Sequence, residues 1–249
     1  MSGHSKWATI KRKKGALDAK RGAVFTKIIK EIMVSARMGG SSVEGNARLR
    51  IAVLKAKAAN MPKDNIDRAI KKGAGELDGQ EFVELTYEAY APGGVALLIE
   101  TLTDNRNRTA ADVRMILTKG NGSLATAGAV VRLFDRKGYI VVDSEKATEE
   151  QVMEIALEAG ADDIVDTGMG QIEITSAPGD FEALLGALEK AGIATEMAEI
   201  SLIPQTRVTP ELSLAEKVQT LVDRLEENDD VQSVYHNLDT SILDDGAEE

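Results

Sequence analysis

Hydrophobic residues recur every three to four positions in the first third of the chain, a period typical of amphipathic helices. The clearest stripe predicts a helix over residues 16–38, and shorter stripes predict helices over 46–59 and from Pro62 onward. The pair Gly39-Gly40 is expected to end the first helix, because glycine adopts the left-handed backbone conformation without a steric penalty. Three amphipathic helices with short connections predict a small helical bundle within residues 1–78.

The pattern changes to that of strands after residue 81. Apolar residues predict one strand over 82–90 and a second, more deeply buried strand over 95–102. The polar run 103–109 is expected to open a helix, with Thr109 and Asp112 as its capping pair. This part of the chain therefore predicts a sheet covered by at least one helix.

The next segment is predicted to begin with a hairpin, formed by strands 129–134 and 139–142 around Asp135-Arg136-Lys137-Gly138. A capping box, Thr148 to Gln151, then opens a helix. The remaining expected elements are strands over 163–166, 171–175 and 196–203 and a helix over 180–191. From the strand 139–142 onward, the order βαββαβ is that of a ferredoxin-like domain.

The chain ends with a predicted helix over 210–227 and a strand over 231–237. The segment 79–135 lacks one helix and one strand of its own, and residues 206–249 supply one of each. We therefore expect 136–205 to be inserted into a discontinuous domain formed by these two segments. The predicted fold is multi-domain α and α+β: an N-terminal three-helix bundle plus two ferredoxin-like α+β domains, one inserted in the other.

Charge is divided unequally along the chain. Residues 1–78 carry 18 Lys and Arg against 7 Asp and Glu, a net charge of +11, whereas residues 79–249 carry 12 against 34, a net charge of −22. The positive part attracts nucleic acid and the negative part repels it. We therefore expect the basic end to bind a polyanion, and its candidate contact residues are His4, Lys6, Trp7, Lys11, Arg12, Lys13, Lys14, Lys20, Arg21, Lys27 and Lys30.

The sequence gives little support to other chemistry. The chain has no cysteine, which excludes disulfides and thiolate chemistry, and His4 and His236 lie at opposite ends of it. We expect no cofactor, no metal and no catalysis. The polar residues Asp104, Asn105, Arg106, Asn107 and Arg108 have three interpretations: a turn with a helix cap, a loop that contacts nucleic acid, and, least favoured, an enzyme site.

Several short motifs resemble the YebC/PmpR family, which includes a mitochondrial translational activator of cytochrome c oxidase subunit I. They cover essentially the whole chain: Gly3-His-Ser-Lys-Trp7, Asp18-Ala-Lys-Arg-Gly22, Phe25-Thr-Lys27, Asn60-Met-Pro62, Arg68-Ala-Ile-Lys71, Tyr87-Glu88, Pro92-Gly-Gly94 and Thr103-Asp-Asn-Arg-Asn-Arg-Thr109. The sequence departs from the family pattern at Gly120-Asn121-Gly122 and Gly128-Ala129-Val130, both outside the basic region. The resemblance implies three domains, an N-terminal helical bundle and two α+β domains.

The resemblance implies a regulator of gene expression that binds nucleic acid. Members are described both as transcriptional regulators that bind promoter DNA and as ribosome-associated translation factors, so promoter DNA, ribosomal RNA and the ribosome are the expected partners. The sequence shows no set of Arg, Asn and Gln at base-reading spacing, which favours backbone contact with ribosomal RNA. The alternative is a scaffold whose acidic domains bind protein. No apolar run approaches the roughly 18 residues of a membrane span, and we expect a cytoplasmic monomer without a membrane partner.

Overall fold

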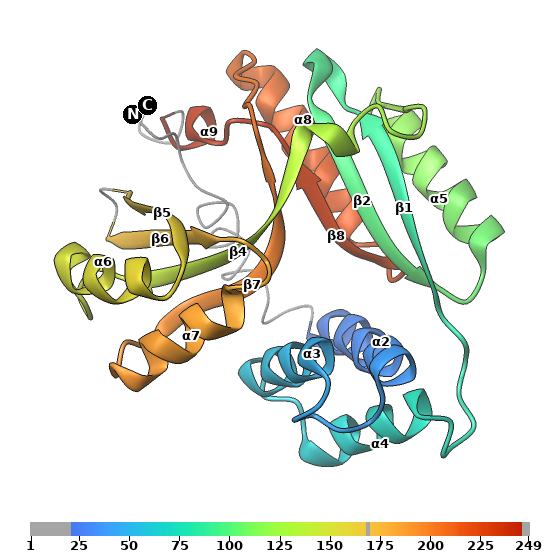
Figure 1. Ribbon diagram of the computed structural model, residues 1–249. Coiled ribbons are helices and arrows are strands. Elements are labelled where there is room, and N and C mark those ends of the chain that lie inside the picture. The colour runs from blue at the N-terminus through green and yellow to red at the C-terminus, as the bar shows by residue number, and fades with distance from the viewer. Residues whose placement is uncertain (1–20, 168–169, 246–249) are drawn as a thin grey trace. The chain divides into compact units, whose positions relative to one another are not determined.

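The computed structural model describes residues 21–167 and 170–245 (Figure 1). The chain divides into two compact units. Within the described residues, one unit contains 21–131 together with Pro210–His236, and the other contains Arg132–Thr209 together with residues 237–245.

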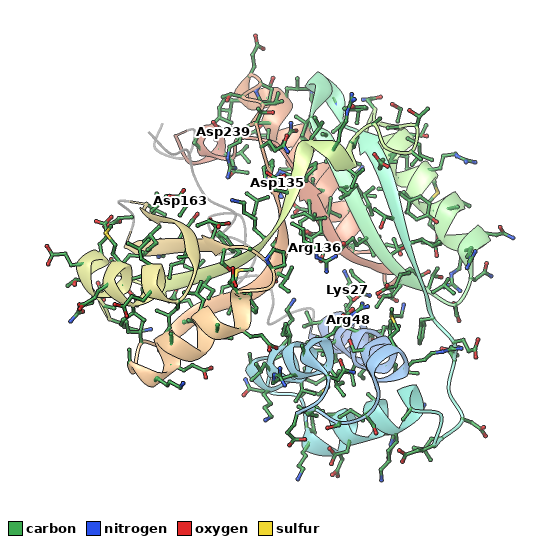
Figure 2. All side chains as sticks on the ribbon, viewed as in Figure 1. Lys27, Arg48, Asp135, Arg136, Asp163 and Asp239 are labelled. Atoms are coloured by element: carbon green, nitrogen blue, oxygen red, sulfur yellow. The ribbon has the colours of Figure 1, made fainter. Side chains whose placement is uncertain are left out.

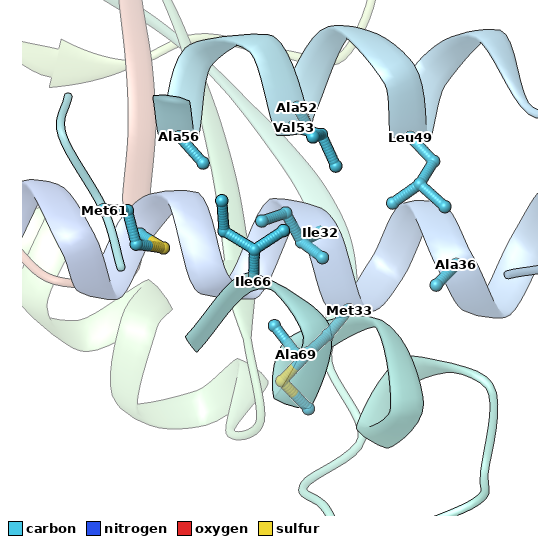
Figure 3. Close-up of a cluster of buried hydrophobic side chains, with 10 residues drawn as sticks. All are labelled: Ile32, Met33, Ala36, Leu49, Ala52, Val53, Ala56, Met61, Ile66 and Ala69. Atoms are coloured by element: carbon cyan, nitrogen blue, oxygen red, sulfur yellow. The ribbon is translucent and has the colours of Figure 1, made fainter. Parts of the chain in front are cut away.

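The first unit begins with three helices, α2 (Arg21–Gly39), α3 (Ala47–Ala58) and α4 (Lys63–Gly73). They share one apolar core, shown in Figure 3: Ile32, Met33, Ala36, Leu49, Ala52, Val53, Ala56, Met61, Ile66 and Ala69. A Cβ atom at Gly73 would lie 2.3 Å from the Met33 carbonyl oxygen, so only glycine allows α4 to approach α2 this closely. These contacts fix the backbone on which the basic side chains of α3 and α4 are mounted.

A buried asparagine joins α2 to α3. The Asn46 side-chain oxygen accepts a hydrogen bond from the Leu49 amide and caps α3, while its amide nitrogen donates to the carbonyl oxygens of Ser35 and Gly40, each at 2.8 Å. Gly40 has a φ of +87°, the left-handed conformation expected after a helix end. One side chain thus satisfies backbone groups at both ends of the α2–α3 connection.

The same unit contains an antiparallel sheet of order β3-β1-β2-β8. Its strands are β1 (Val83–Tyr90), β2 (Ala96–Thr103), β3 (Ser123–Leu124) and β8 (Val231–His236). Helices α5 (Arg106–Lys119) and α8 (Leu212–Glu226) pack against each other and against this sheet, and a short 3-10 turn, η2 (Pro92–Gly94), joins β1 to β2. The pairing of β8 with β2 brings the late segment of the chain back to an early strand.

The second unit has the order β4 (Phe134–Asp143), α6 (Glu149–Glu158), β5 (Ala161–Asp166), β6 (Gln171–Ser176), α7 (Phe181–Lys190) and β7 (Thr195–Pro204). Its sheet has the order β5-β6-β4-β7 and is antiparallel throughout. Helices α6 and α7 pack against each other. The unit also contains the short helix α9 (Ser241–Asp245), and a 3-10 turn, η3 (Val131–Leu133), precedes β4.

The expected mixed α+β multi-domain class is confirmed, and most helices and strands lie where the sequence predicts them. The predicted hairpin around Asp135-Arg136-Lys137-Gly138 is wrong. Residues 131–133 form η3, and β4 runs without interruption through the turn-like sequence. The physical reason is pairing with a distant strand: Asp135 lies opposite Ile203, and Arg136 lies opposite Leu202. The exact limits of the inserted domain stay a prediction.

Two predicted helix starts also need correction. Asn105, not Thr109, caps α5, and its side-chain oxygen accepts a hydrogen bond from the Arg108 amide. Pro62 occupies the cap position of α4 and not its first turn. The capping box from Thr148 to Gln151 is confirmed, with both reciprocal hydrogen bonds present.

Candidate nucleic-acid interface

Most residues of the predicted contact surface lie outside the part of the chain that the structure describes. These are His4, Lys6, Trp7, Lys11, Arg12, Lys13, Lys14 and Lys20. Arg21 is the first described residue of α2, and Lys27 and Lys30 follow it on the same helix. Of the predicted contact residues, the structure therefore describes Arg21, Lys27 and Lys30. It also describes helices α3 and α4, which follow α2.

Lys30 faces inward, which corrects its assignment to the contact surface. It is 8% exposed, and its ammonium donates to the Asp230 carboxylate at 2.8 Å and to the Asp229 carbonyl oxygen at 2.8 Å. It also lies 5.4 Å from the centre of the Phe82 ring. Because this ammonium is enclosed by protein atoms, we leave Lys30 out of the surface proposed for nucleic acid.

Lys27 also contacts the end of α8, since its ammonium donates to the Glu226 carbonyl oxygen at 2.6 Å. Two lysines of α2 thus lie at the C-terminal end of α8, where the helix dipole favours positive charge. The sequence places both on the polar side of α2, and nothing in the local pattern distinguishes them from lysines that face solvent. Their partners lie 199 and 200 residues away along the chain.

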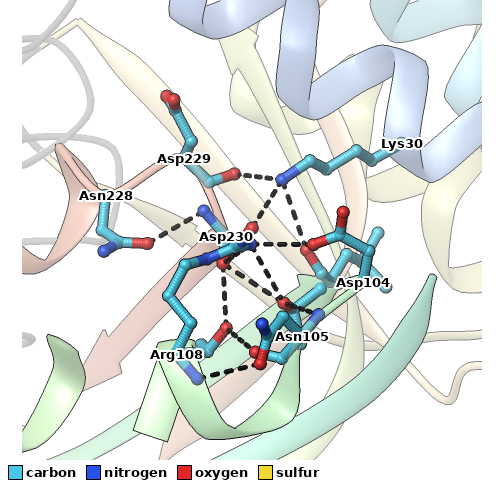
Figure 4. A network of polar contacts seen from close by, with 10 residues as sticks. Lys30, Asp104, Asn105, Arg108, Asn228, Asp229 and Asp230 are labelled. Atoms are coloured by element: carbon cyan, nitrogen blue, oxygen red, sulfur yellow. Dashed lines mark hydrogen bonds and ion pairs between the residues drawn. The ribbon is translucent and has the colours of Figure 1, made fainter. Parts of the chain in front are cut away.

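Asp230 lies at the centre of a network of polar contacts, which we call the Asp230 network (Figure 4). Its carboxylate accepts hydrogen bonds from Lys30 at 2.8 Å, Arg108 at 2.7 Å, Thr109 at 2.8 Å and Thr103 at 3.2 Å. Burial alone would raise the pKa of Asp230, but the hydrogen bonds from Lys30, Arg108 and Thr109 outweigh it and lower that pKa to about 2. The network joins α2, the start of α5 and the turn between α8 and β8.

The polar run after β2 supplies part of this network and the cap of α5. Arg108 also pairs with Asp104 at 2.8 Å, and the Thr103 hydroxyl accepts a hydrogen bond from the Asn105 amide. These contacts agree with the interpretation of the run as a turn and helix cap. All five residues singled out in the sequence are exposed, and Asp104, Asn105 and Arg108 take part in these contacts (Figure 4). Arg106 and Asn107 lie in the first turn of α5.

The α3–α4 segment carries a second group of basic residues, which do not belong to the predicted contact set. Helix α3 contains four basic residues and no acid. Arg48 pairs with Glu31 and Glu84, and Arg50 donates to backbone carbonyls. The exposed basic residues here, which we call the α3–α4 basic surface, are Lys55, Lys57, Lys63, Arg68 and Lys71. The amphipathic pattern and the regional charge would have been sufficient to identify them.

Within residues 21–167 and 170–245, no group of three or more His, Cys, Asp or Glu residues is arranged to hold a metal ion. No helix in these ranges is long and apolar enough to cross a membrane. Figure 2 shows the side chains of both units, including Lys27 and Arg48 in the first. Helices α3 and α4 thus carry exposed basic side chains, whereas Lys30 on α2 is buried in an ion pair with Asp230.

Comparison with known proteins gives matches over nearly all of the chain. The family model described as the TACO1/YebC protein N-terminal domain matches residues 5–76, and the model for the TACO1/YebC second and third domain matches residues 82–238. A probable transcriptional regulatory protein from Desulforapulum autotrophicum is 55% identical, and the match covers 96% of this chain and 96% of that protein. One of the same description from Treponema pallidum is 57% identical over 96% of this chain and 97% of its own.

A solved structure is also similar. The crystal structure of a conserved hypothetical protein from Aquifex aeolicus matches with a TM-score of 0.81 and 47% sequence identity. The match covers 89% of this chain and 91% of that chain. The similarity therefore extends across both units and is not limited to one motif.

Proposed function

The chain belongs to the TACO1/YebC family, and from this premise we propose that it is a non-enzymatic regulator of gene expression that binds nucleic acid. The binding surface is the basic N-terminal region, residues 1–78, and it contacts the phosphate backbone. The observation that carries this proposal is the division of charge, +11 in this region against −22 in the remainder. Relatives named as probable transcriptional regulatory proteins support the regulatory role.

The proposed contact surface combines two groups of residues. The first is the predicted set without Lys30, and its densest part is the run Lys11-Arg12-Lys13-Lys14. The second is the α3–α4 basic surface. Phosphate binding by lysine and arginine releases condensed counterions, and this release gives an affinity that falls steeply with salt.

We propose promoter DNA as the first target, because the relatives are named as transcriptional regulators. Ribosomal RNA is the second candidate, in which case the protein acts on translation at the ribosome. The observation that favours RNA is the lack, in the sequence, of an Arg, Asn and Gln set spaced for reading bases in the major groove. Crosslinking in cells followed by sequencing of the bound nucleic acid distinguishes the two targets.

A charge-reversal experiment tests the binding surface. Replacing Lys11, Arg12, Lys13 and Lys14 by Glu is expected to abolish binding of a labelled duplex or RNA in a fluorescence anisotropy titration. The matched control reverses four exposed basic residues elsewhere, Arg114, Lys119, Lys217 and Arg224, and so changes the total charge by the same amount. Equal loss of binding in both variants would show that only total charge matters, and unaltered binding in the first would refute the proposed surface.

We also propose the finer architecture expected from the sequence, an N-terminal three-helix bundle and two ferredoxin-like domains. The shared core of α2, α3 and α4 supports the first part, and the strand order β5-β6-β4-β7 supports a ferredoxin-like arrangement for one of the two domains. The proposed inserted domain comprises residues 136–205. Expressed alone, it is expected to unfold cooperatively on heating, as followed by circular dichroism.

A further inference from the structure

Helix α6 combines exposed apolar residues with dense negative charge. Its buried side is provided by Val152 and Ala156, which are both fully buried. On the exposed side, Met153 is 39% exposed and Leu157 is 57% exposed. They lie four residues apart, and side chains at this spacing are neighbours on a helix.

This apolar pair differs from the other exposed hydrophobic residues. Single exposed apolar side chains are normal on protein surfaces. Within the described ranges, the remaining exposed large hydrophobics each lie on a different helix, turn or connection: Met38, Leu54, Leu77, Met115, Val131 and Leu212. Only Met153 and Leu157, among these described residues, lie one helical turn apart.

The charged side chains of α6 itself are all negative. Helix α6 has four Glu and no Lys or Arg, and Glu150, Glu154 and Glu158 repeat at intervals of four beside Met153 and Leu157. All three are exposed. The neighbouring edge strand β5, against which α6 packs, carries three exposed aspartates, including Asp163, labelled in Figure 2. One of the three, Asp162, pairs with Lys137 at 3.5 Å. Residues 132–209 as a whole contain 6 Lys and Arg against 16 Asp and Glu.

We propose that this face of α6, defined by Glu150, Met153, Glu154, Leu157 and Glu158, binds a basic amphipathic segment of another protein. Negative charge repels nucleic acid and anionic lipid surfaces, and it would place Glu against Glu if a second copy of the chain docked through the same face. A segment with lysine or arginine beside leucine or isoleucine matches both features, because it neutralises the glutamates and covers Met153 and Leu157. The proposal does not depend on nucleic-acid binding by the N-terminal region.

Such a partner carries excess positive charge, which is common among proteins that themselves bind nucleic acid. With a basic region at one end of the sequence and the α6 face in the acidic part, the chain has one surface for a polyanion and another for a polycation. The protein would then act as an adaptor that holds a basic protein near the nucleic acid it contacts. This role adds a partner to the proposed function without changing the nucleic-acid target.

Fluorescence anisotropy with the full-length protein tests the proposal. The probe is a labelled 15-residue helical peptide of lysine and leucine with one apolar stripe, and two control peptides carry the same composition without the stripe or glutamate in place of lysine. The first peptide is expected to bind, and each control is expected to bind at least tenfold more weakly. Absence of binding by the first peptide, or equal binding of the peptide without the stripe, would overturn the proposal.

Variants locate the binding face. The double variant Met153→Ser with Leu157→Ser removes the apolar contacts without changing the charge and is expected to weaken peptide binding at least tenfold. The matched control is Met115→Ser with Leu212→Ser, because these are also exposed apolar residues, at 48% and 37%, on α5 and α8. Both changes lie on exposed surface, and circular dichroism at 222 nm checks that the fold is retained. Equal weakening in the two variants, or self-association of the wild type that only the α6 variant loses in sedimentation velocity, would refute a basic protein partner at this face.

Discussion

The strongest prediction from the structure concerns Asp230→Asn, which removes the charge at the centre of the Asp230 network. Asp230 is 5% exposed and its partner Lys30 is 8% exposed, so the change leaves a buried ammonium without its carboxylate. Breaking a buried ion pair on one side typically costs about 3–5 kcal/mol. The lowered pKa of Asp230 gives a separate measure: a shift from 3.8 to about 2 corresponds to a stabilisation of about 2 kcal/mol at neutral pH.

The assay is urea denaturation at pH 7, followed by circular dichroism at 222 nm. Asp230→Asn is expected to lower the free energy of unfolding by about 3 kcal/mol. The control is Arg37→Met, which breaks an ion pair with Glu81 whose side chains are 50% and 76% exposed. An exposed pair contributes at most about 1 kcal/mol. A loss in Asp230→Asn no larger than that in Arg37→Met would refute the inference that the Asp230 network stabilises this unit.

The pH dependence of the free energy of unfolding tests the same network, and its direction follows from the lowered pKa of Asp230. Because the folded-state pKa of Asp230 lies below the ordinary value of 3.8, its contribution is complete well above that value and is lost as pH falls toward 2. The stability difference between wild type and Asp230→Asn should therefore shrink between about pH 5 and pH 2. A difference that stays constant over this range would contradict the assignment of the shift to Asp230.

Three further predictions test local contacts. Asn46→Ala should lower the free energy of unfolding by about 1–2 kcal/mol in urea denaturation, because it removes the α3 cap and two buried donors; no change would contradict this role. Gly73→Ala should lower the melting temperature through the clash with Met33, whereas Gly186→Ala, with no atom within 4 Å of the new Cβ, should raise or preserve it, and similar effects would refute the packing argument. Glu88→Gln should speed hydrogen exchange at residues 128–131, since the carboxylate accepts three amides there, and unchanged exchange would contradict it.

Local sequence signals predicted the elements that depend on contacts between residues close together in the sequence. The apolar stripe over 16–38 corresponds to α2 from Arg21 onward, and the capping box at Thr148 starts α6 as expected. The hairpin failed because the turn-like residues after Phe134 gain more from pairing with β7 than from turning. That pairing joins residues more than 60 positions apart, and no local propensity contains it.

Contacts between distant parts of the sequence also decided the roles of residues in the candidate site. Lysine content identified a basic region, but it did not separate Lys30, whose partner Asp230 lies 200 residues away, from lysines on the surface. Thr109 was expected to cap α5, yet its hydroxyl donates to Asp230 and Asn105 takes the cap. In both cases the sequence identified the right residue type, and a contact between distant segments decided its role.

The salt dependence of nucleic-acid affinity tests the central claim most directly. If about six basic side chains reach phosphates, the slope of log K against log salt concentration should be roughly −4 to −5 for the full-length protein. Reversal of Lys11, Arg12, Lys13 and Lys14 should move this slope toward zero, while reversal of Arg114, Lys119, Lys217 and Arg224 should leave it nearly unchanged. A slope near zero for the wild type, or an equal change in both variants, would contradict binding of the phosphate backbone by the basic N-terminal region.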